Sequence, residues 1–388
     1  MAKIDDSVKK KVPELRFPGF TDDWEERKLK DIAQFNPKTV LPDEFEYVDL
    51  ESVVGTEMIS HRTESKDQAP SRAQRLAQKG DVFYQTVRPY QMNNYLYDLP
   101  YDNYVFSTGY AQMRPNIDSY FLLNSVQNKQ FVQHVLDRST GTSYPAINSS
   151  DLSNIEIHVP SKLSEQQKIG AFFQSIDDTI ALHQRKLDLL KEQKKGYLQK
   201  MFPKNGAKVP ELRFAGFADD WEERKLGDIT KISTGKLDAN AMVENGKYDF
   251  YTSGIKKYRI DVAAFEGPSI TIAGNGATVG YMHLADNKFN AYQRTYVLQE
   301  FLVDRSFIFS EIGNKLPKKI KQEARTGNIP YIVMDMLTEL KLSIPQNNSE
   351  QEKIGSFFNR LDNTIALHQR KLDLLKEQKK GYLQKMFV

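Results

Sequence analysis

Two stretches of this sequence carry arginine and lysine among amide and tyrosine side chains, a mixture suited to reading a nucleic acid. Arginine can make two hydrogen bonds to a guanine edge, asparagine or glutamine two to an adenine edge, and lysine mostly meets phosphate. The candidates in the first stretch are Arg72, Arg75, Lys79, Gln85, Arg88, Tyr90, Gln91, Asn93 and Asn94. Those in the second stretch are Lys256, Lys257, Tyr258, Arg259, Tyr292, Gln293, Arg294, Lys318, Lys319, Lys321 and Arg325. The alternative for any one of these clusters is an ordinary solvated face.

Two short loops add to this hypothesis because they keep the same place in each half of the chain. Gly141 lies 21 residues after Tyr120, and Gly327 lies 21 residues after Ser306. Both loops are rich in small hydroxyl, amide and glycine groups, which can approach a nucleic-acid backbone closely. Their candidate residues are Thr140, Gly141, Thr142, Ser143, Thr326 and Asn328.

A glycine-rich stretch, Gly274–Gly280, is a further candidate. Glycine-rich turns after a strand can hold phosphates, but Tyr281–Leu284 continues as a strand pattern and no helix follows. The pattern therefore predicts a tight hairpin turn. The alternative is a contact to a nucleic-acid backbone through Asn275.

No pattern in the sequence indicates catalysis. There is no G-x-x-x-x-G-K-[ST] phosphate loop, no G-x-S-x-G nucleophile elbow and no cysteine. The six histidines show none of the spacings of a zinc site. Asn36, Pro37 and Lys38 depart from the Asn/Asp-Pro-Pro-aromatic signature of amino-methyltransferases. We therefore expect a chain with no catalytic residue, metal site or cofactor of its own.

The elements that must position these loops are two repeats. Glu165–Phe202 and Glu350–Phe387 match at 32 of 38 positions with an offset of 185 residues. Lys11–Ile32 and Lys208–Ile229 match at 19 of 22 positions. The chain is thus a short repeat, a variable region and a long repeat, followed by the same order again.

The short repeat contains both tryptophans of the chain, Trp24 and Trp221, at matching places. Phe17 and Phe20 match Phe214 and Phe217 in the same way. These aromatic residues predict a small packing anchor that docks each variable region.

The long repeat has apolar residues at alternating steps of four and three, the heptad pattern of a helix that pairs with another helix. The seam of the first copy consists of Ile169, Phe173, Ile176, Ile180, His183, Leu187, Leu190 and Tyr197. The seam of the second copy consists of Ile354, Phe358, Leu361, Ile365, His368, Leu372, Leu375 and Tyr382. About 37 residues at 1.5 Å each give a helix of roughly 55 Å. Two matching seams predict that the copies pair with each other, and antiparallel pairing spares the chain a return along the whole helix.

Four polar residues interrupt the seams: His183, Lys194, His368 and Lys379. Polar residues at seam positions lower stability and can fix the register of a helix pair. The alternative is that they lie at a wide or frayed part of the pair.

The variable regions have short apolar runs, broken by Pro, Gly, Asn and Asp, together with helix-like segments, which indicates the α+β class. We expect two globular domains of like fold joined by two long helices, paired as an antiparallel coiled coil with internal pseudo-two-fold symmetry. The expected boundaries are 12–160 for the first globular domain, 163–202 for the central helix, 203–207 for a linker, 208–345 for the second globular domain and 348–388 for the last helix.

The composition of the chain further limits the class of protein to which it can belong. No apolar run approaches the length of a membrane span, and Met1–Lys11 lacks the apolar core of a signal peptide. The absence of cysteine fits a reducing cytoplasm. The net charge is only +3, and the long helices are more basic than the rest of the chain. Their charge is either a solvated helix surface or an attraction to a polyanion.

The order of variable region, long helix, variable region, long helix resembles the specificity subunit of a type I restriction-modification system. The long repeats are similar to that family's conserved regions and begin with E-Q-x-K-I-G-x-F-F at Glu165–Phe173 and Glu350–Phe358. The family's lead-in to these helices is matched by Ile157–Pro160 and Leu342–Pro345. The resemblance covers essentially the whole chain, but inside the variable regions it is only architectural.

The resemblance implies a function in DNA recognition. Each globular domain would be a target recognition domain that reads one half of a bipartite, asymmetric sequence in double-stranded DNA, and the helix pair would set the spacer. The chain would bind two methyltransferase subunits, and restriction subunits would join that core. S-adenosylmethionine, ATP and Mg²⁺ would belong to the partner subunits, and the complex would work in the bacterial cytoplasm.

Two other functions compete with this one. The chain could be a coiled-coil scaffold for proteins, with globular domains that bind peptides and read no DNA. Salt-dependent binding to duplex DNA in the presence of the partner separates this alternative from DNA recognition. A single-chain nuclease is disfavoured because nuclease and nucleotide-binding motifs are missing.

Overall fold

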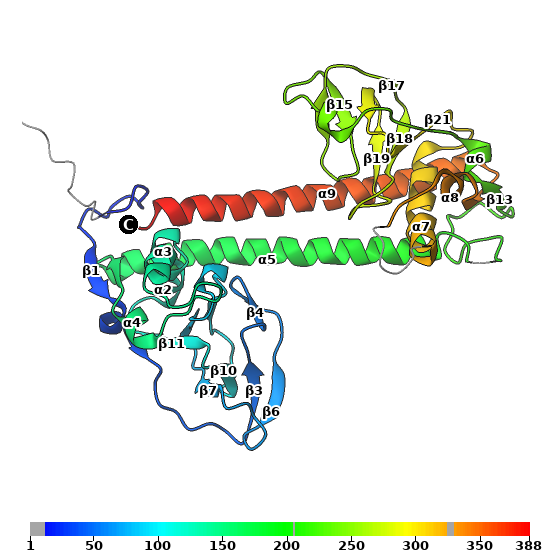
Figure 1. The fold of residues 1–388 in the computed structure, drawn as a ribbon. Coiled ribbons are helices and arrows are strands. Elements are labelled where there is room, and N and C mark those ends of the chain that lie inside the picture. Colours follow the sequence, from blue (N-terminus) through cyan, green and yellow to red (C-terminus); the bar gives the residue numbers. More distant parts are fainter. Residues whose placement is uncertain (1–11, 205, 324–329) are drawn as a thin grey trace, which may run out of the picture. The chain divides into compact units, whose positions relative to one another are not determined.

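The computed structural model describes residues 12–204, 206–323 and 330–388. The chain packs into two compact units. The first unit combines the described residues up to His183 with Lys371–Val388, and the second unit is Gln184–Arg370. Figure 1 labels many of the helices and strands of both units.

The first unit contains two four-stranded sheets. One sheet has the order β2-β11-β8-β9, with β2 at Ala33–Phe35, β11 at Tyr110–Pro115, β8 at Val82–Gln85 and β9 at Tyr95–Leu96. The other has the order β6-β3-β10-β7, with β6 at Arg62–Ser65, β3 at Glu44–Val48, β10 at Tyr104–Ser107 and β7 at Ala73–Leu76. A short hairpin of β4 (Val53–Val54) and β5 (Glu57–Met58) lies between β3 and β6 in the chain.

The second unit repeats the topology of the two four-stranded sheets strand for strand. Its first sheet has the order β14-β21-β18-β19, at Lys231–Thr234, Thr295–Gln299, Ser269–Ala273 and Met282–Ala285. Its second sheet has the order β16-β15-β20-β17, at Tyr258–Ile260, Tyr248–Tyr251, Lys288–Ala291 and Phe265–Glu266. In both units the second sheet contains one parallel pair, β3 with β10 and β15 with β20. Two globular regions of one α+β fold are therefore present, as the sequence predicts.

Short helices complete each unit. In the first unit they are α1 (Leu29–Ile32), η1 (Pro89–Gln91), α2 (Ser119–Val126), α3 (Lys129–Asp137) and α4 (Ser149–Ser153). In the second unit they are α6 (Leu226–Ile229), η2 (Ala239–Ala241), α7 (Arg305–Glu323) and α8 (Met334–Thr338). A two-stranded pair joins the short repeat to the strand before each long helix: β1 (Glu25–Lys28) with β12 (Glu156–Val159), and β13 (Glu222–Lys225) with β22 (Lys341–Ile344).

The long repeats form the helices α5 (Leu163–Lys200) and α9 (Asn348–Lys385) (Figure 1). Within the first unit, Phe172 of α5 packs on Tyr382 of α9, and Asp177 pairs with Lys379 at 2.6 Å. The partner number falls as the α5 number rises, so these segments are antiparallel.

Within the second unit the same contacts occur with the helices exchanged. Tyr197 packs on Phe357, and Lys194 pairs with Asp362 at 2.5 Å. The two units therefore contain the same pair of contacts with the roles of the two helices exchanged. The ion pairs made by Lys194 and Lys379 favour the register role of these polar seam residues over a frayed pair.

The seam positions are buried or half-buried along both helices. In each unit the tryptophan of the short repeat lies in the core beside the end of a long helix. Trp24 has its ring 6.4 Å from Phe387 and 5.7 Å from Phe121, and Trp221 has its ring 6.1 Å from Phe202 and 5.7 Å from Phe307. The predicted packing anchor is confirmed.

Candidate nucleic-acid interface

In the first unit, two loops that are far apart in the sequence lie side by side. The loop after β8 turns sharply through η1, because Arg88 and Met92 both adopt left-handed backbone conformations. The Arg88 N–H donates to the Pro145 carbonyl at 2.8 Å, and Ala146 pairs with Thr140 across the second loop. The Arg88 guanidinium lies 4.5 Å from the centre of the Tyr144 ring. We call the residues 88–93 and 140–144 the first reading face.

The side chains of this face offer several chemistries to solvent. Tyr90 and Tyr144 are 49% and 64% exposed. The other exposed candidates are Gln91, Thr140, Gly141, Thr142 and Ser143. Aromatic, amide, hydroxyl and guanidinium groups therefore occur together, as base and phosphate recognition requires.

Arg72 borders this face through the backbone. Its carbonyl accepts from the Thr108 N–H at 2.8 Å, and the neighbouring Gly109 carbonyl accepts from the Thr86 N–H at 2.9 Å. Arg72 is exposed, and these backbone bonds connect it to Thr86, two residues before the first reading face begins.

Other candidates of the first unit lie elsewhere. Gln85 and Asn94 are buried and support the loop: the Asn94 Oδ1 accepts from the Gln85 N–H at 2.8 Å, and the Gln85 Nε2 donates to the Val87 carbonyl. Arg75 is half-buried on β7, and burial lowers its pKa. Lys79 precedes β8 and lies at the opposite end of that strand from the loop.

The β4–β5 hairpin is a feature that the sequence patterns above do not predict. Asn93 connects this hairpin to the first reading face, since its Oδ1 accepts from the Gly55 N–H at 2.9 Å. Val54 and Ile59 are 57% and 61% exposed beside this connection. The signal was present as a glycine between two very short apolar runs, which is typical of a hairpin turn.

In the second unit the loop between β18 and β19 takes the corresponding place. The Gly274 N–H donates to the Arg294 carbonyl at 2.9 Å, its carbonyl accepts from the Ile332 N–H at 2.7 Å, and Asn275 pairs with Tyr331. The Gly280 N–H closes the turn onto the Ala273 carbonyl at 2.8 Å. The predicted hairpin turn is confirmed.

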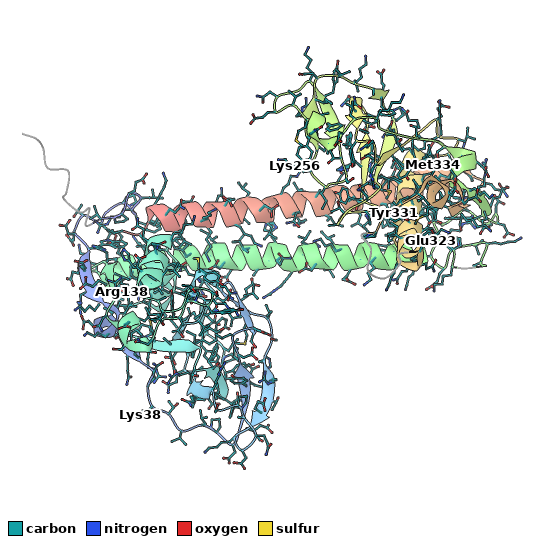
Figure 2. The ribbon with its side chains drawn as sticks, viewed as in Figure 1. Lys38, Arg138, Lys256, Glu323, Tyr331 and Met334 are labelled. Carbon is teal, nitrogen blue, oxygen red and sulfur yellow. The ribbon has the colours of Figure 1, made fainter. Side chains whose placement is uncertain are left out.

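Further candidates gather around this turn. The Ser253 hydroxyl donates to the Asn275 Oδ1, and the Thr278 hydroxyl donates to the Ser253 carbonyl, so the turn lies against the segment that leads to Lys256. The Tyr292 N–H donates to the Tyr251 carbonyl at 2.9 Å, which brings Tyr292–Arg294 to the same place. We call the residues 253–257, 275–278, 292–294 and Tyr331 the second reading face; Figure 2 labels Lys256 and Tyr331.

The cations in and beside the second face differ in the contacts that they already make. Lys256 and Lys257 are exposed and lie over the rings of Tyr258 and Tyr251 at 5.4 and 5.3 Å, and Lys257 also lies 3.9 Å from the Asp249 carboxylate. The Arg259 side chain is held within the β15–β16 hairpin, where it donates to the Gly246 and Lys247 carbonyls and forms an ion pair with Asp249.

One histidine, His283, lies close to Lys257 of the second face. His283 lies against Tyr251 with ring centres 5.1 Å apart, and burial lowers its pKa. His283 is therefore neutral near pH 7 and adds no charge to the second face.

The remaining described candidates of the second unit lie on α7. Lys318 and Lys321 are exposed, and Lys319 pairs with Glu323 at 2.6 Å. Ile320 between them packs close to Gly280 at the end of the hairpin turn. Arg325, Thr326 and Asn328 lie outside the described residues.

The two faces share one backbone frame. Ile147 donates to the Thr86 carbonyl at 3.0 Å in the first unit, and Ile332 donates to the Gly274 carbonyl at 2.7 Å in the second. In each unit this bond joins the loop before a short helix, α4 or α8, to the residue that follows the central strand, β8 or β18. The frame is repeated, whereas the side chains that it presents are different.

Each long helix also carries two exposed leucines outside its seam. Leu182 and Leu189 on α5 are 67% and 51% exposed, and Leu367 and Leu374 on α9 are 61% and 51% exposed. Each pair is spaced by seven residues, so its members share one face of their helix. These four leucines, which we call the rod leucines, are not part of the seam.

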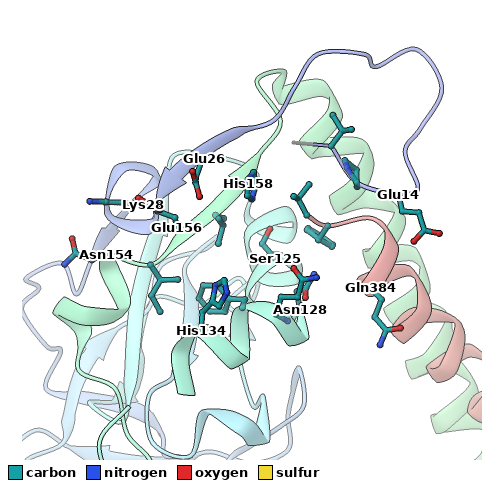
Figure 3. Close-up of a pocket in the computed structure, with 18 of the residues that line it drawn as sticks. Glu14, Glu26, Lys28, Ser125, Asn128, His134, Asn154, Glu156, His158 and Gln384 are labelled. Carbon is teal, nitrogen blue, oxygen red and sulfur yellow. Dashed lines mark hydrogen bonds between the residues drawn. The ribbon is translucent and has the colours of Figure 1, made fainter. Parts of the chain in front are cut away.

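The first unit also has a pocket of about 740 Å³ beside β1, β12, α3 and the end of α9 (Figure 3). Its lining combines the charged or titratable side chains of Glu26, Glu156, Lys28 and His134 with apolar ones such as Phe131. Mixed charge of this kind does not favour a polyanion. Among the residues that the structure describes, no group of histidine and carboxylate side chains could hold a metal ion, and no helix could span a membrane.

Comparisons with known proteins give one consistent family. The model of the type I restriction modification DNA specificity domain matches residues 21–192 and 218–377. The type I restriction enzyme EcoDI specificity subunit of Escherichia coli is 32% identical over 42% of this chain and 37% of its own length, so the chain spans about a third of that relative. The MjaVIII specificity subunit of Methanocaldococcus jannaschii is 22% identical over 68% of each chain.

Solved structures share the fold. The S subunit of a type I restriction-modification system from M. genitalium has a TM-score of 0.72 at 18% identity and covers 97% of this chain and 99% of its own. A chain from a structure of complex assembly and conformational transition in the type I R-M system has a TM-score of 0.51 at 20% identity, over 96% and 99%.

Proposed function

Since the chain belongs to the family of type I restriction-modification DNA specificity domains, we propose that it selects the DNA sequence on which its complex acts. Each reading face contacts one half of a bipartite, asymmetric target in double-stranded DNA. The helices α5 and α9 hold the two recognition domains and set the spacer. The chain itself contributes no catalytic residue.

One observation carries this proposal: the two reading faces have the same backbone frame and different side chains. A repeated frame means that both domains approach their ligand in the same way. Because the side chains differ, the two ligands differ. Two unlike half-sites on one duplex fit both conditions, whereas one repeated peptide ligand would require similar faces.

The chemistry of the faces also favours DNA. Arg88, Gln91 and Arg294 can read base edges in the major groove, and Lys256, Lys257 and Lys318 can meet phosphates. Binding should therefore weaken with salt, since each neutralised phosphate releases counterions.

A methylation map tests the proposal. DNA from cells that make this chain with a cognate methyltransferase subunit should carry a split motif, with two unlike halves around a fixed gap. Exchange of residues 36–160 for those of a relative should change one half only. A map without any motif, from cells in which the same methyltransferase works with another specificity subunit, would instead support the peptide-binding scaffold.

The rod leucines support a second part of the proposal, the assembly of the complex. Exposed leucines at a spacing of seven on long helices suit a partner helix. We assign them to two methyltransferase subunits, with restriction subunits joining that core. S-adenosylmethionine, ATP and Mg²⁺ would then act in the partners, in the bacterial cytoplasm.

Charge placed on this surface tests the assignment. Leu189→Glu with Leu374→Glu should lower copurification of the methyltransferase subunit, while the chain alone keeps its melting temperature. The control is Gln193→Glu with Gln378→Glu, which adds the same charges at exposed positions of the same helices. Equal copurification of both double variants would exclude the rod leucines as the docking surface.

A further inference from the structure

A polar joint connects the short repeat to the first turn of α5 in the first unit. The Arg16 guanidinium makes two hydrogen bonds to the Glu165 carboxylate, at 2.6 and 2.8 Å, and a third to the Asp22 carbonyl at 2.7 Å. The Glu165 side chain is only 2% exposed, and the Trp24 indole N–H points at it from 3.4 Å. A buried, bidentate ion pair of this kind fixes direction as well as distance.

The next residue of α5 extends the joint to the recognition domain. The Gln166 Oε1 accepts from the Asp118 N–H at 3.2 Å, and its Nε2 donates to the Pro160 carbonyl at 2.9 Å. Asp118 is also the N-cap of α2, since its Oδ1 accepts from the Phe121 N–H at 2.8 Å. One glutamine thus ties the long helix to the start of α2 and to the end of β12.

A glycine allows this close approach. A Cβ added at Gly170 would overlap Asp118 Oδ1. The start of α2 therefore rests directly on the backbone of α5. We call Arg16, Asp118, Glu165, Gln166 and Gly170 the first clasp.

The second unit contains the same joint. Arg213 binds Glu350 at 2.7 and 2.8 Å, and Gln351 accepts from the Asp304 N–H at 2.9 Å and donates to the Pro345 carbonyl at 2.8 Å. A Cβ added at Gly355 would lie 2.6 Å from Asp304 Oδ1. We call Arg213, Asp304, Glu350, Gln351 and Gly355 the second clasp.

We propose that the two clasps determine how strictly the complex measures the gap between the half-sites. The inference rests on the proposed function, and it concerns positioning residues rather than residues that touch DNA. The clasps are alike contact for contact, although the sequences of the recognition domains around them differ. Each clasp joins a recognition domain to its long helix by four hydrogen bonds and one close approach of the Asp118 or Asp304 side chain to a glycine of that helix, so it leaves the domain little freedom to tilt. Adjacent base pairs are separated by about 3.4 Å, so a small tilt at the joint is enough to bring a face to the wrong pair.

Gly355→Ala tests the proposal because it wedges the second clasp apart without changing any face residue. Gly381→Ala is the matched control, since it lies on the same helix and its added Cβ would meet nothing within 4 Å. Each full-length variant is combined with the methyltransferase subunit and a mixture of duplexes whose gap is one base pair shorter, equal or one longer. The readout is the ratio of methylation at altered and native gaps within one tube, which does not depend on the fraction of folded protein.

We expect Gly355→Ala to shift this ratio toward an altered gap by about tenfold, the scale of one misplaced base contact, and Gly381→Ala to behave as the unchanged chain. Gln351→Met removes two hydrogen bonds without adding bulk, and it decides the matter if Gly355→Ala does not fold. Unchanged ratios with lower total methylation would show that the clasps only stabilise the fold, and would overturn the proposal. An unchanged chain that shows no fixed gap would instead overturn the proposed function.

Discussion

The two globular domains share every strand of their four-stranded sheets but differ in what surrounds the reading face. The first has the additional β4–β5 hairpin, attached through Asn93, and an aromatic core in which Phe83 stacks on Phe106 with ring centres 3.7 Å apart. The second has only a short connection between β15 and β16, and that connection carries Lys256 and Lys257. The loops vary freely because the frame beneath them is held by backbone hydrogen bonds, which do not depend on the side chains.

The two clasps differ from the reading faces in this respect, because the clasps have identical side chains in both units. One difference lies in the tryptophan beside them: the Trp24 N–H points at Glu165, whereas the Trp221 N–H has no hydrogen-bond partner in the described part of the chain. The predictions below use this comparison between the units.

Loss of the clasp arginine should have the largest effect. Arg213→Ala leaves the buried Glu350 without its cation and should lower the free energy of unfolding of the second unit by about 3–5 kcal/mol. Arg16→Ala should cost less in the first unit, because Glu165 keeps a donor in Trp24. Urea unfolding followed by the fluorescence of Trp221 in a Trp24→Phe background, and of Trp24 in a Trp221→Phe background, measures the two units separately. Equal losses would show that the indole contact adds nothing.

A buried carboxyl group should make the second unit respond to pH. Glu311 on α7 is buried, and burial raises its pKa to about 7; the corresponding residue of the first unit is Ser125, which donates to the Phe121 carbonyl. The folded state holds the proton more tightly than the unfolded state. The contribution of Glu311 to stability should therefore be greatest below about pH 4.5, fall as pH rises toward 7 and then level, by up to about 3 kcal/mol.

Glu311→Gln should remove this dependence from the second unit and raise its stability at pH 8. Unfolding of the variant and the unchanged chain at pH 5 and pH 8 measures the effect. A pH response that persists in the variant would assign it to another group.

Single residues of the reading faces should separate base recognition from phosphate contact. Arg88→Lys loses the planar guanidinium over Tyr144 and should cost about 1–3 kcal/mol at one base pair of one half-site. Lys256→Ala should weaken binding to all sequences alike and reduce the salt slope by about one. Binding of the assembled complex to duplexes mutated at each position, at two salt concentrations, distinguishes these outcomes. A sequence-specific loss from Lys256→Ala would place this lysine on a base.

The β4–β5 hairpin should have the smallest effect. If exposed Val54 meets the methyl group of a thymine, Val54→Ser should lose about 1 kcal/mol or less at one position of the first half-site. Substitution of uracil for thymine at that position should abolish the difference between the variant and the unchanged chain. The second half-site should not respond, because the described part of the second unit has no such hairpin.

The architecture could be predicted because its signals are local and repeated. The steps of four and three in Glu165–Phe202 follow from helix geometry alone, and a second seam at an offset of 185 residues identified the partner. The glycine spacing of Gly274–Gly280 predicted the hairpin turn for the same reason.

The reading faces could not be predicted in the same way. Gln85 and Asn94 carry the residue types of base readers, yet they are buried and support the loop. Only the pairing of strands far apart in the sequence places Arg88 beside Tyr144 and Asn275 beside Tyr331.

The sequence by itself therefore determined the order of the elements, the pairing of the long helices and the family, because periodicity and duplication need no tertiary contact to be read. The tertiary structure decided which side chains face solvent, that Asn93 connects a hairpin to the first face, and that Arg16 and Gly170 belong to one joint. Those facts depend on sheet register and on close approach between distant segments, where a change of one residue reverses the direction of a side chain.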